Sequence, residues 1–87
     1  MKLFKAIDVW KKGESGQIIR YRCFEVFPDK KFCVQGVDYY YSPFEASRII
    51  EHEKNYFELF DEEDPDIRGG AFPTLELAIK KHDEKFQ

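Results

Sequence analysis

The sequence predicts one α+β domain over residues 1–87, in which a three-stranded antiparallel sheet is followed by two helices packed on one of its faces. Two turn signals divide residues 1–41 into three segments of alternating polar and apolar side chains, a pattern typical of strands. Apolar residues recur at helical spacing in two later segments. Nine Phe, five Tyr and one Trp supply the large side chains that a short chain needs for its core.

The three predicted strands form two consecutive hairpins, a meander. In the first strand the side chains at positions 4, 6, 8 and 10 share one face, and those at 3, 5, 7 and 9 share the other. Gly13 and Gly16 lie in the following turn, where glycine can take positive φ angles. The second strand is predicted over residues 17–27, and Pro28-Asp29-Lys30-Lys31 forms the next turn. The third strand then covers residues 32–37.

The register of the second hairpin decides which apolar residues share a face. A three-residue connection places Phe24 and Val26 on one face with Phe32 and Val34. We prefer this register because it gathers large apolar side chains on a single face. A two-residue connection is the alternative, and it would place Phe27 beside Phe32.

The end of the third strand contains three consecutive tyrosines, Tyr39, Tyr40 and Tyr41. Gly36 is predicted to mark a bulge, from which residues 37–41 leave the sheet. Neighbouring residues of an extended chain point to opposite sides, so at least one tyrosine is expected on the surface. Because tyrosine is enriched at protein interfaces, this segment is a candidate contact surface.

The first helix has the clearest local signal. Ser42-Pro43-Phe44-Glu45 matches a capping box with Pro at the first helical position. Apolar residues at helical spacing, interrupted by Glu53, extend the predicted helix to about Phe60. The alternative ends the helix near residues 54–55 and makes 56–60 a fourth strand, which gives the order β-β-β-α-β-α. The apolar residues of the longer predicted helix are Ala46, Ile49, Ile50, Phe57 and Phe60.

The second helix is predicted to begin near Thr74, which is a suitable N-cap residue. Residues 61–70 before it are expected to form a loop, because acids, a proline and two glycines interrupt any periodic pattern. The apolar stripe of the second helix consists of Leu75, Ala78, Ile79, His82 and Phe86.

The composition of the chain indicates its cellular compartment. No apolar run approaches the roughly 20 residues of a membrane-spanning helix, and charges recur within residues 1–8, so neither membrane insertion nor a secretory signal is expected. Two cysteines are too few for a disulfide framework. We therefore expect a cytoplasmic protein with reduced thiols. The net charge is −3, with bases in excess before residue 32 and acids in excess after it.

A Cys/His catalytic site is the least favoured of three function hypotheses. In the preferred register Cys23 and Cys33 share the sheet face away from the large apolar cluster, but no motif surrounds them. His52 and His82 lie on different predicted helices. We therefore predict no catalytic residues, no metal site and no cofactor, and we do not expect an enzyme.

An acidic segment follows the first helix. Counted from Asp64, calcium-loop spacing fails, because Arg68 takes the fifth position and Leu75 the twelfth. The glycines after Arg68 do not form a phosphate-binding Walker loop, because the lysine and the spacing of that motif are absent. We interpret the acidic segment as a solvated surface or a docking patch for a basic partner. Its residues are Glu58, Asp61, Glu62, Glu63, Asp64 and Asp66.

Nucleic-acid binding is the second hypothesis. Arg20 and Arg22 alternate with aromatic residues in the second strand, and Lys30 and Lys31 follow in the turn. Sheets that bind RNA combine stacking rings and cations in this way. The glycine and aromatic motif of an RRM strand is absent, and a pI of about 5.4 disfavours a basic footprint.

The leading hypothesis is a protein-interaction module, such as an inhibitor, an immunity-type protein, an adaptor or an accessory protein. It would use the acidic segment and the exposed tyrosines among residues 39–41 to bind a protein partner with a basic contact surface, and a homodimer is the alternative.

Overall fold

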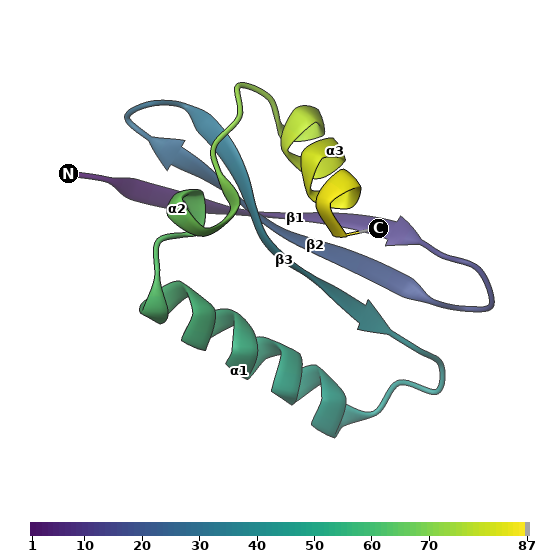
Figure 1. Ribbon diagram of the computed structural model, residues 1–87. Coiled ribbons are helices and arrows are strands. Elements are labelled where there is room, and N and C mark those ends of the chain that lie inside the picture. The colour runs from purple at the N-terminus through teal and green to yellow at the C-terminus, as the bar shows by residue number, and fades with distance from the viewer. Residues whose placement is uncertain (87) are drawn as a thin grey trace.

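A computed structural model describes residues 1–86 and contains three strands followed by three helices (Figure 1). The α+β class and the three-stranded antiparallel order are confirmed. The strands are β1 (Leu3–Lys12), β2 (Ile18–Phe27) and β3 (Lys31–Tyr40), and the helices are α1 (Ala46–Glu62), α2 (Pro65–Gly69) and α3 (Leu75–Phe86). None of these helices has the length and apolar composition of a membrane-spanning segment.

The central strand β2 pairs with β1 on one side and with β3 on the other. Ile7 lies opposite Cys23 and Val9 lies opposite Tyr21, so the alternation predicted for the first strand is confirmed. Because β2 has a neighbour along each edge, it contributes most of the buried positions of the sheet.

The preferred register of the second hairpin is wrong. Phe24 pairs with Cys33, and Glu25 pairs with Phe32. A four-residue connection between Val26 and Lys31 produces this pairing, and Lys30 N–H donates to the Val26 carbonyl at 2.8 Å. One residue of difference in a turn exchanges the faces of a whole strand. The large apolar residues are therefore divided between the two faces of the sheet.

A bulge does occur next to Gly36, as predicted. The register shifts between Arg22 and Cys23, which leaves Gln35 as the extra residue of β3. The prediction that the chain leaves the sheet there is wrong, because β3 continues to Tyr40.

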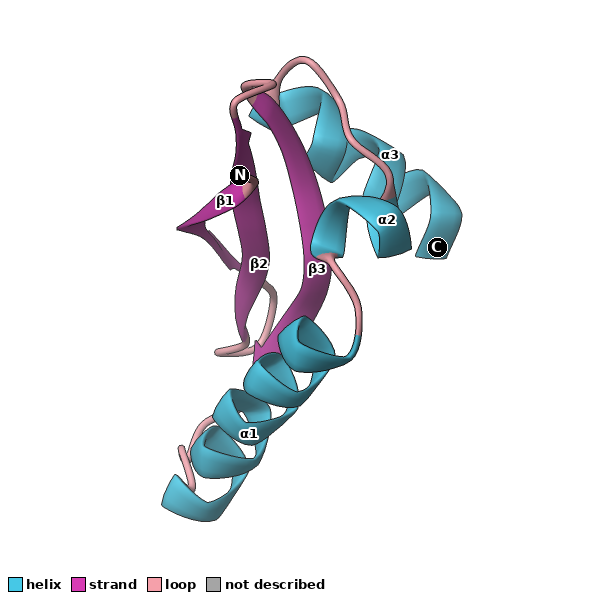
Figure 2. Cartoon of the chain, turned by 90° about the vertical axis from the view of Figure 1, so that its left-hand side faces the viewer, coloured by secondary structure: helices cyan, strands magenta, loops and turns pink. Residues whose placement is uncertain are grey.

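The helices cover opposite faces of the sheet, whereas both were expected on one face. Ala78 of α3 packs on Tyr21, Cys23 and Val34, with Leu75 and Ile79 around them. Side chains of α1 pack on the other face, where the buried residues are Phe24, Val26 and Cys33. In Figure 2, α2 and α3 lie on one side of the strands and α1 lies apart from them. The divided apolar residues explain this arrangement, because each face then needs its own cover.

The long form of the first helix is confirmed, and the alternative fourth strand over 56–60 is wrong. The predicted capping box is also wrong, because α1 begins one residue after Glu45 and that residue makes no side-chain cap. Only part of the predicted apolar stripe faces the sheet: Phe60 stacks on Phe24 at 5.1 Å, whereas Ile50 is 66% exposed and Phe57 is 64% exposed. Glu53 and Tyr56 also face the sheet, and Arg22 of the sheet explains why a carboxylate is favourable there.

The segment expected to be a loop contains the short helix α2, which packs against β3. Gly69 allows this contact, because a Cβ atom there would lie 2.6 Å from the carbonyl oxygen of Val34. Farther along, Phe72 exchanges two backbone hydrogen bonds of 2.8 Å with Phe32 and covers part of the outer edge of β3. The N-cap prediction at Thr74 is confirmed, since its Oγ1 accepts from Leu77 N–H at 3.1 Å.

Candidate interaction site

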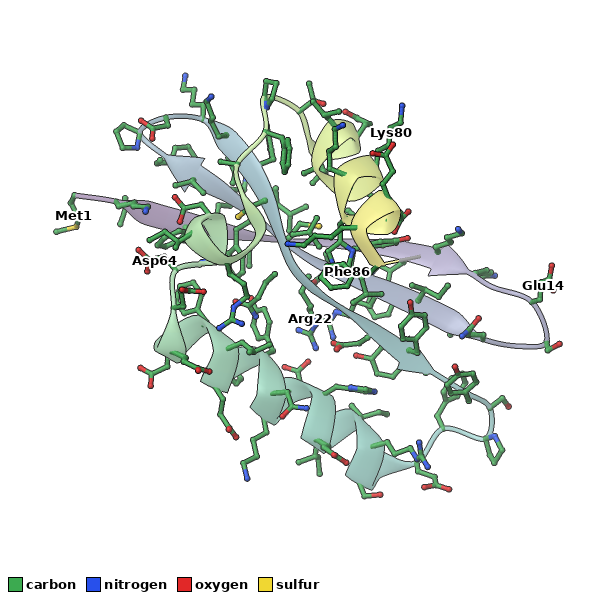
Figure 3. All side chains as sticks on the ribbon, viewed as in Figure 1. Met1, Glu14, Arg22, Asp64, Lys80 and Phe86 are labelled. Atoms are coloured by element: carbon green, nitrogen blue, oxygen red, sulfur yellow. The ribbon has the colours of Figure 1, made fainter. Side chains whose placement is uncertain are left out.

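Two arginines of β2 point toward α1 and meet one carboxylate. Arg20 and Arg22 are two residues apart in the strand, so their side chains share a face. Glu53 of α1 accepts a hydrogen bond from Arg20 at 3.1 Å and another from Arg22. Arg22 is only 3% exposed, and Figure 3 shows it between the sheet and α1. The hydrogen bond from Arg22 lowers the pKa of Glu53, while partial desolvation acts in the opposite direction.

The flanking strands supply further carboxylates to these arginines. Asp38 of β3 accepts from Nε of Arg22 at 2.7 Å, and Asp8 of β1 accepts from Arg20 at 2.9 Å. Aromatic rings cover the guanidinium planes: Arg20 lies 4.9 Å from the ring centroid of Trp10, and Arg22 lies 4.4 Å from that of Tyr56. We call these residues the arginine network, and it joins all three strands to α1.

This arrangement bears on the nucleic-acid hypothesis. Arg20 and Arg22 are already paired with carboxylates and are turned toward the protein interior. Lys30 and Lys31 are exposed at the other end of β2, where Val26, the partner of Lys31, lies four residues from Arg22 and six from Arg20, which corresponds to about 13 and 20 Å. The four bases therefore do not form one surface that could follow a phosphate backbone.

An apolar groove of about 250 Å³ adjoins the arginine network. Tyr40 and Arg20 lie at its base, and the ring of Tyr40 lies 6.1 Å from that of Trp10 and 5.0 Å from that of His52. Trp10 is 56% exposed and Phe44 is 50% exposed, so large rings border the groove in contact with solvent. We call it the aromatic groove; it is lined by Trp10, Ile18, Arg20, Tyr40, Phe44 and Ile49.

The three candidate tyrosines take different positions. Tyr40 is buried, whereas Tyr39 and Tyr41 are exposed. This difference follows from the alternation of side chains along β3, which extends farther than the sequence predicted. Tyr41 accepts a hydrogen bond of 3.0 Å from the side-chain amide of Gln17, which holds its ring beside the first hairpin turn.

The candidate acidic residues gather at the opposite end of α1 from the tyrosines. The helix has 17 residues, which corresponds to about 25 Å, so the two candidate groups do not form one compact site. Several of the acids have partners. Lys2 lies 2.9 Å from Asp66 and 3.4 Å from Asp64, while Arg68 lies 3.8 Å from Glu63. Glu58 pairs with Lys54, Glu62 lies 3.9 Å from Arg68, and Asp61 is exposed.

The aromatic groove is the feature that the sequence reasoning missed. One signal for it was present, because Trp10 is the last apolar residue before the first turn and falls on the same strand face as Asp8. Phe44 and Ile49 carried no such signal, since the capping box placed Phe44 inside the helix. Their contribution depends on the path of residues 41–45 between β3 and α1.

The thiols are separated by the sheet. Cys23 belongs to the cluster under α3 and Cys33 to the cluster under α1, so the prediction that they share a face is wrong. Burial raises the pKa of Cys23 to about 12 and that of Cys33 to about 11. Over residues 1–86, His, Cys, Asp and Glu side chains form no group of three or more that could hold a metal ion.

No protein-family model matches this chain, and neither a curated protein nor a solved structure matches it. The fold and the site together define a three-stranded α+β domain with helices on both faces, an arginine network under α1 and an aromatic groove beside it.

Proposed function

We propose that this protein is a protein-interaction module whose contact surface follows α1, from the aromatic groove at its start to the acidic residues at its end. The observation that carries the proposal is the groove itself, where exposed Trp and Phe rings border an apolar hollow above a buried Tyr. Aromatic anchors of this kind contribute most of the binding energy in many protein interfaces.

The rigidity of the groove supports this proposal. Arg20 is held at its base by Asp8 and Glu53, and it lies under the ring of Trp10. A surface already ordered in the free protein loses less conformational entropy when a partner binds. Scattered exposed apolar residues are ordinary, but a contiguous hollow of large rings is a common feature of contact sites.

Charge defines the chemistry of the partner. The outward side chains of α1 include Glu51, Glu58, Asp61 and Glu62, with Lys54 among them. We therefore propose a partner segment with an apolar side chain for the groove and basic side chains for the acidic end of the helix. Long-range attraction between these charges would speed association and weaken with added salt.

The test is affinity capture from the source cell, with the bound proteins identified by mass spectrometry. The groove variant is Phe44→Ser with Ile49→Ser, and the matched control is Ile67→Ser, which removes an exposed apolar side chain on α2. A specific partner should be retained by the wild type and by the control and lost from the groove variant. Capture that is unaffected by the groove variant would refute the proposed surface.

A second pair of variants tests the acidic end. Asp61→Lys with Glu62→Lys should weaken capture and remove much of its salt dependence, because the opposing charges are then lost. Glu76→Lys with Glu84→Lys makes the same change in net charge on exposed positions of α3. If both double variants weaken capture equally, net charge rather than the surface of α1 explains the binding.

A further inference from the structure

A cavity of about 560 Å³ lies between α3, α2 and β3, and Leu59 near the end of α1 also lines it. Its apolar walls include Leu59, Phe72 and Phe86, and Val34 lies at its base. Figure 3 shows Phe86 over the middle of the sheet, at the end of α3. The volume is within the range of sites that bind small organic molecules. The cavity shares no lining residue with the aromatic groove, although Leu59 belongs to the helix that the proposed contact surface follows.

Cationic side chains gather around this cavity. Arg68 comes from α2, and Lys81 and Lys85 come from α3. Lys81 and Lys85 are four residues apart and therefore lie on one side of their helix. Glu84 lies 3.6 Å from Lys81, and Glu62 and Glu63 lie 3.9 and 3.8 Å from Arg68, but none of these carboxylates lines the cavity. The cavity therefore favours an anion.

The cavity also contains buried polar atoms that have no hydrogen-bond partner within residues 1–86. These atoms are Oε1 of Gln35, Nε of Arg68 and Nδ1 of His82, and all three residues line the cavity. Gln35 is only 7% exposed, and its amide nitrogen donates a hydrogen bond of 3.1 Å to the carbonyl oxygen of Tyr56. Buried polar atoms are nearly always paired in native proteins, so three orphans around one hollow point to groups supplied by a ligand.

We propose that this cavity binds a small organic anion with an apolar body. Its carboxylate or phosphate group accepts from Arg68 and the lysines of α3, and its apolar part packs against Phe72, Phe86 and Leu59. The basic side chains of the lining and the unpaired Nε of Arg68 match the anionic group, and the apolar walls match the body of the ligand.

The experiment uses the full chain labelled with nitrogen-15 and follows its amide signals during titration. The probes are 2-naphthoate, the uncharged 2-naphthamide, naphthyl phosphate and inorganic phosphate. We expect saturable shifts at the Gln35 side chain and at Gly69 with both naphthyl anions. Affinity for the amide and for inorganic phosphate should be at least about tenfold weaker, since each lacks either the charge or the apolar body. Comparing the two naphthyl anions shows which anionic group the cavity prefers.

Two variants complete the test. Arg68→Gln should lower the affinity for 2-naphthoate by about tenfold, because a charge-assisted hydrogen bond is lost. Lys80→Gln removes the same charge from α3 but lies outside the cavity, where Figure 3 shows Lys80 on the outer side of the helix, and it should bind as the wild type does. Thermal unfolding confirms that both variants are folded. Equal binding of 2-naphthoate and 2-naphthamide, equal affinity in both variants, or no saturable shift with any probe would overturn the proposal.

Discussion

Asp38 of β3 accepts a hydrogen bond of 2.7 Å from Nε of Arg22, whose side chain is enclosed between the sheet and α1. This pair joins the bulged part of β3 to the central strand, on the face that α1 covers. An arginine in such a position requires its carboxylate partners, because a buried charge without one is strongly unfavourable.

The first prediction concerns this pair. Asp38→Asn keeps the shape of the side chain and removes its charge, so we expect the free energy of unfolding to fall by about 2–3 kcal/mol, with Glu53 limiting the loss. Urea denaturation measures the effect. The control Glu51→Gln removes one acid from an exposed position of α1 and should change stability by less than about 0.5 kcal/mol. Equal effects of the two variants would mean that the buried pair contributes no more to the free energy of unfolding than an exposed acid does.

The second prediction concerns acid stability. Arg22 lowers the pKa of Glu53 below its ordinary value of 4.5, so the folded protein binds that proton more weakly than the unfolded chain does. The stabilisation is complete above the ordinary value and is lost as pH falls through the lower, folded value. Glu53→Gln should therefore be less stable at neutral pH and should lose less stability on acidification. Unfolding curves measured across this pH range test it, with Glu76→Gln as control; parallel curves for wild type and Glu53→Gln would contradict it.

The third prediction compares two glycines. A methyl group at Gly69 would lie 2.6 Å from the Val34 carbonyl oxygen, whereas one at Gly36 would meet no atom within 4 Å. Gly69→Ala should move α2 away from β3 and lower the free energy of unfolding by about 1–3 kcal/mol. Gly36→Ala should change it by less than about 1 kcal/mol. Thermal and urea unfolding measure both, and similar effects at the two positions would show that α2 does not depend on this close approach.

The fourth prediction concerns the thiols. Desolvation raises the pKa of Cys23 to about 12 and that of Cys33 to about 11, so both remain protonated in the folded protein near neutral pH. We expect a disulfide reagent to modify neither cysteine until the protein unfolds, and both together in denaturant. A thiol that reacts rapidly in the folded state, with a pH profile below that of free cysteine, would instead favour a reactive site.

Local sequence patterns were sufficient for the identity and order of most elements. Alternation predicted the three strands, helical spacing predicted α1 through residues 56–60, and Thr74 marked the start of α3. These features depend on interactions between residues that are close in the chain, and periodicity reports them directly. The same reasoning failed at Ser42, where a sequence that resembled a capping box lies before the helix rather than in it.

The sequence by itself therefore determined the class of this protein, its strand order and its supply of aromatic and charged side chains. Only the tertiary structure decided the register of β2 and β3, the separation of α1 from α3 by the sheet, and the burial of Arg22. One residue in a turn changes the face of a whole strand, and a local pattern does not specify that length. The aromatic groove and the cationic cavity likewise bring together side chains from several elements distant in sequence, so they exist only after the chain has packed.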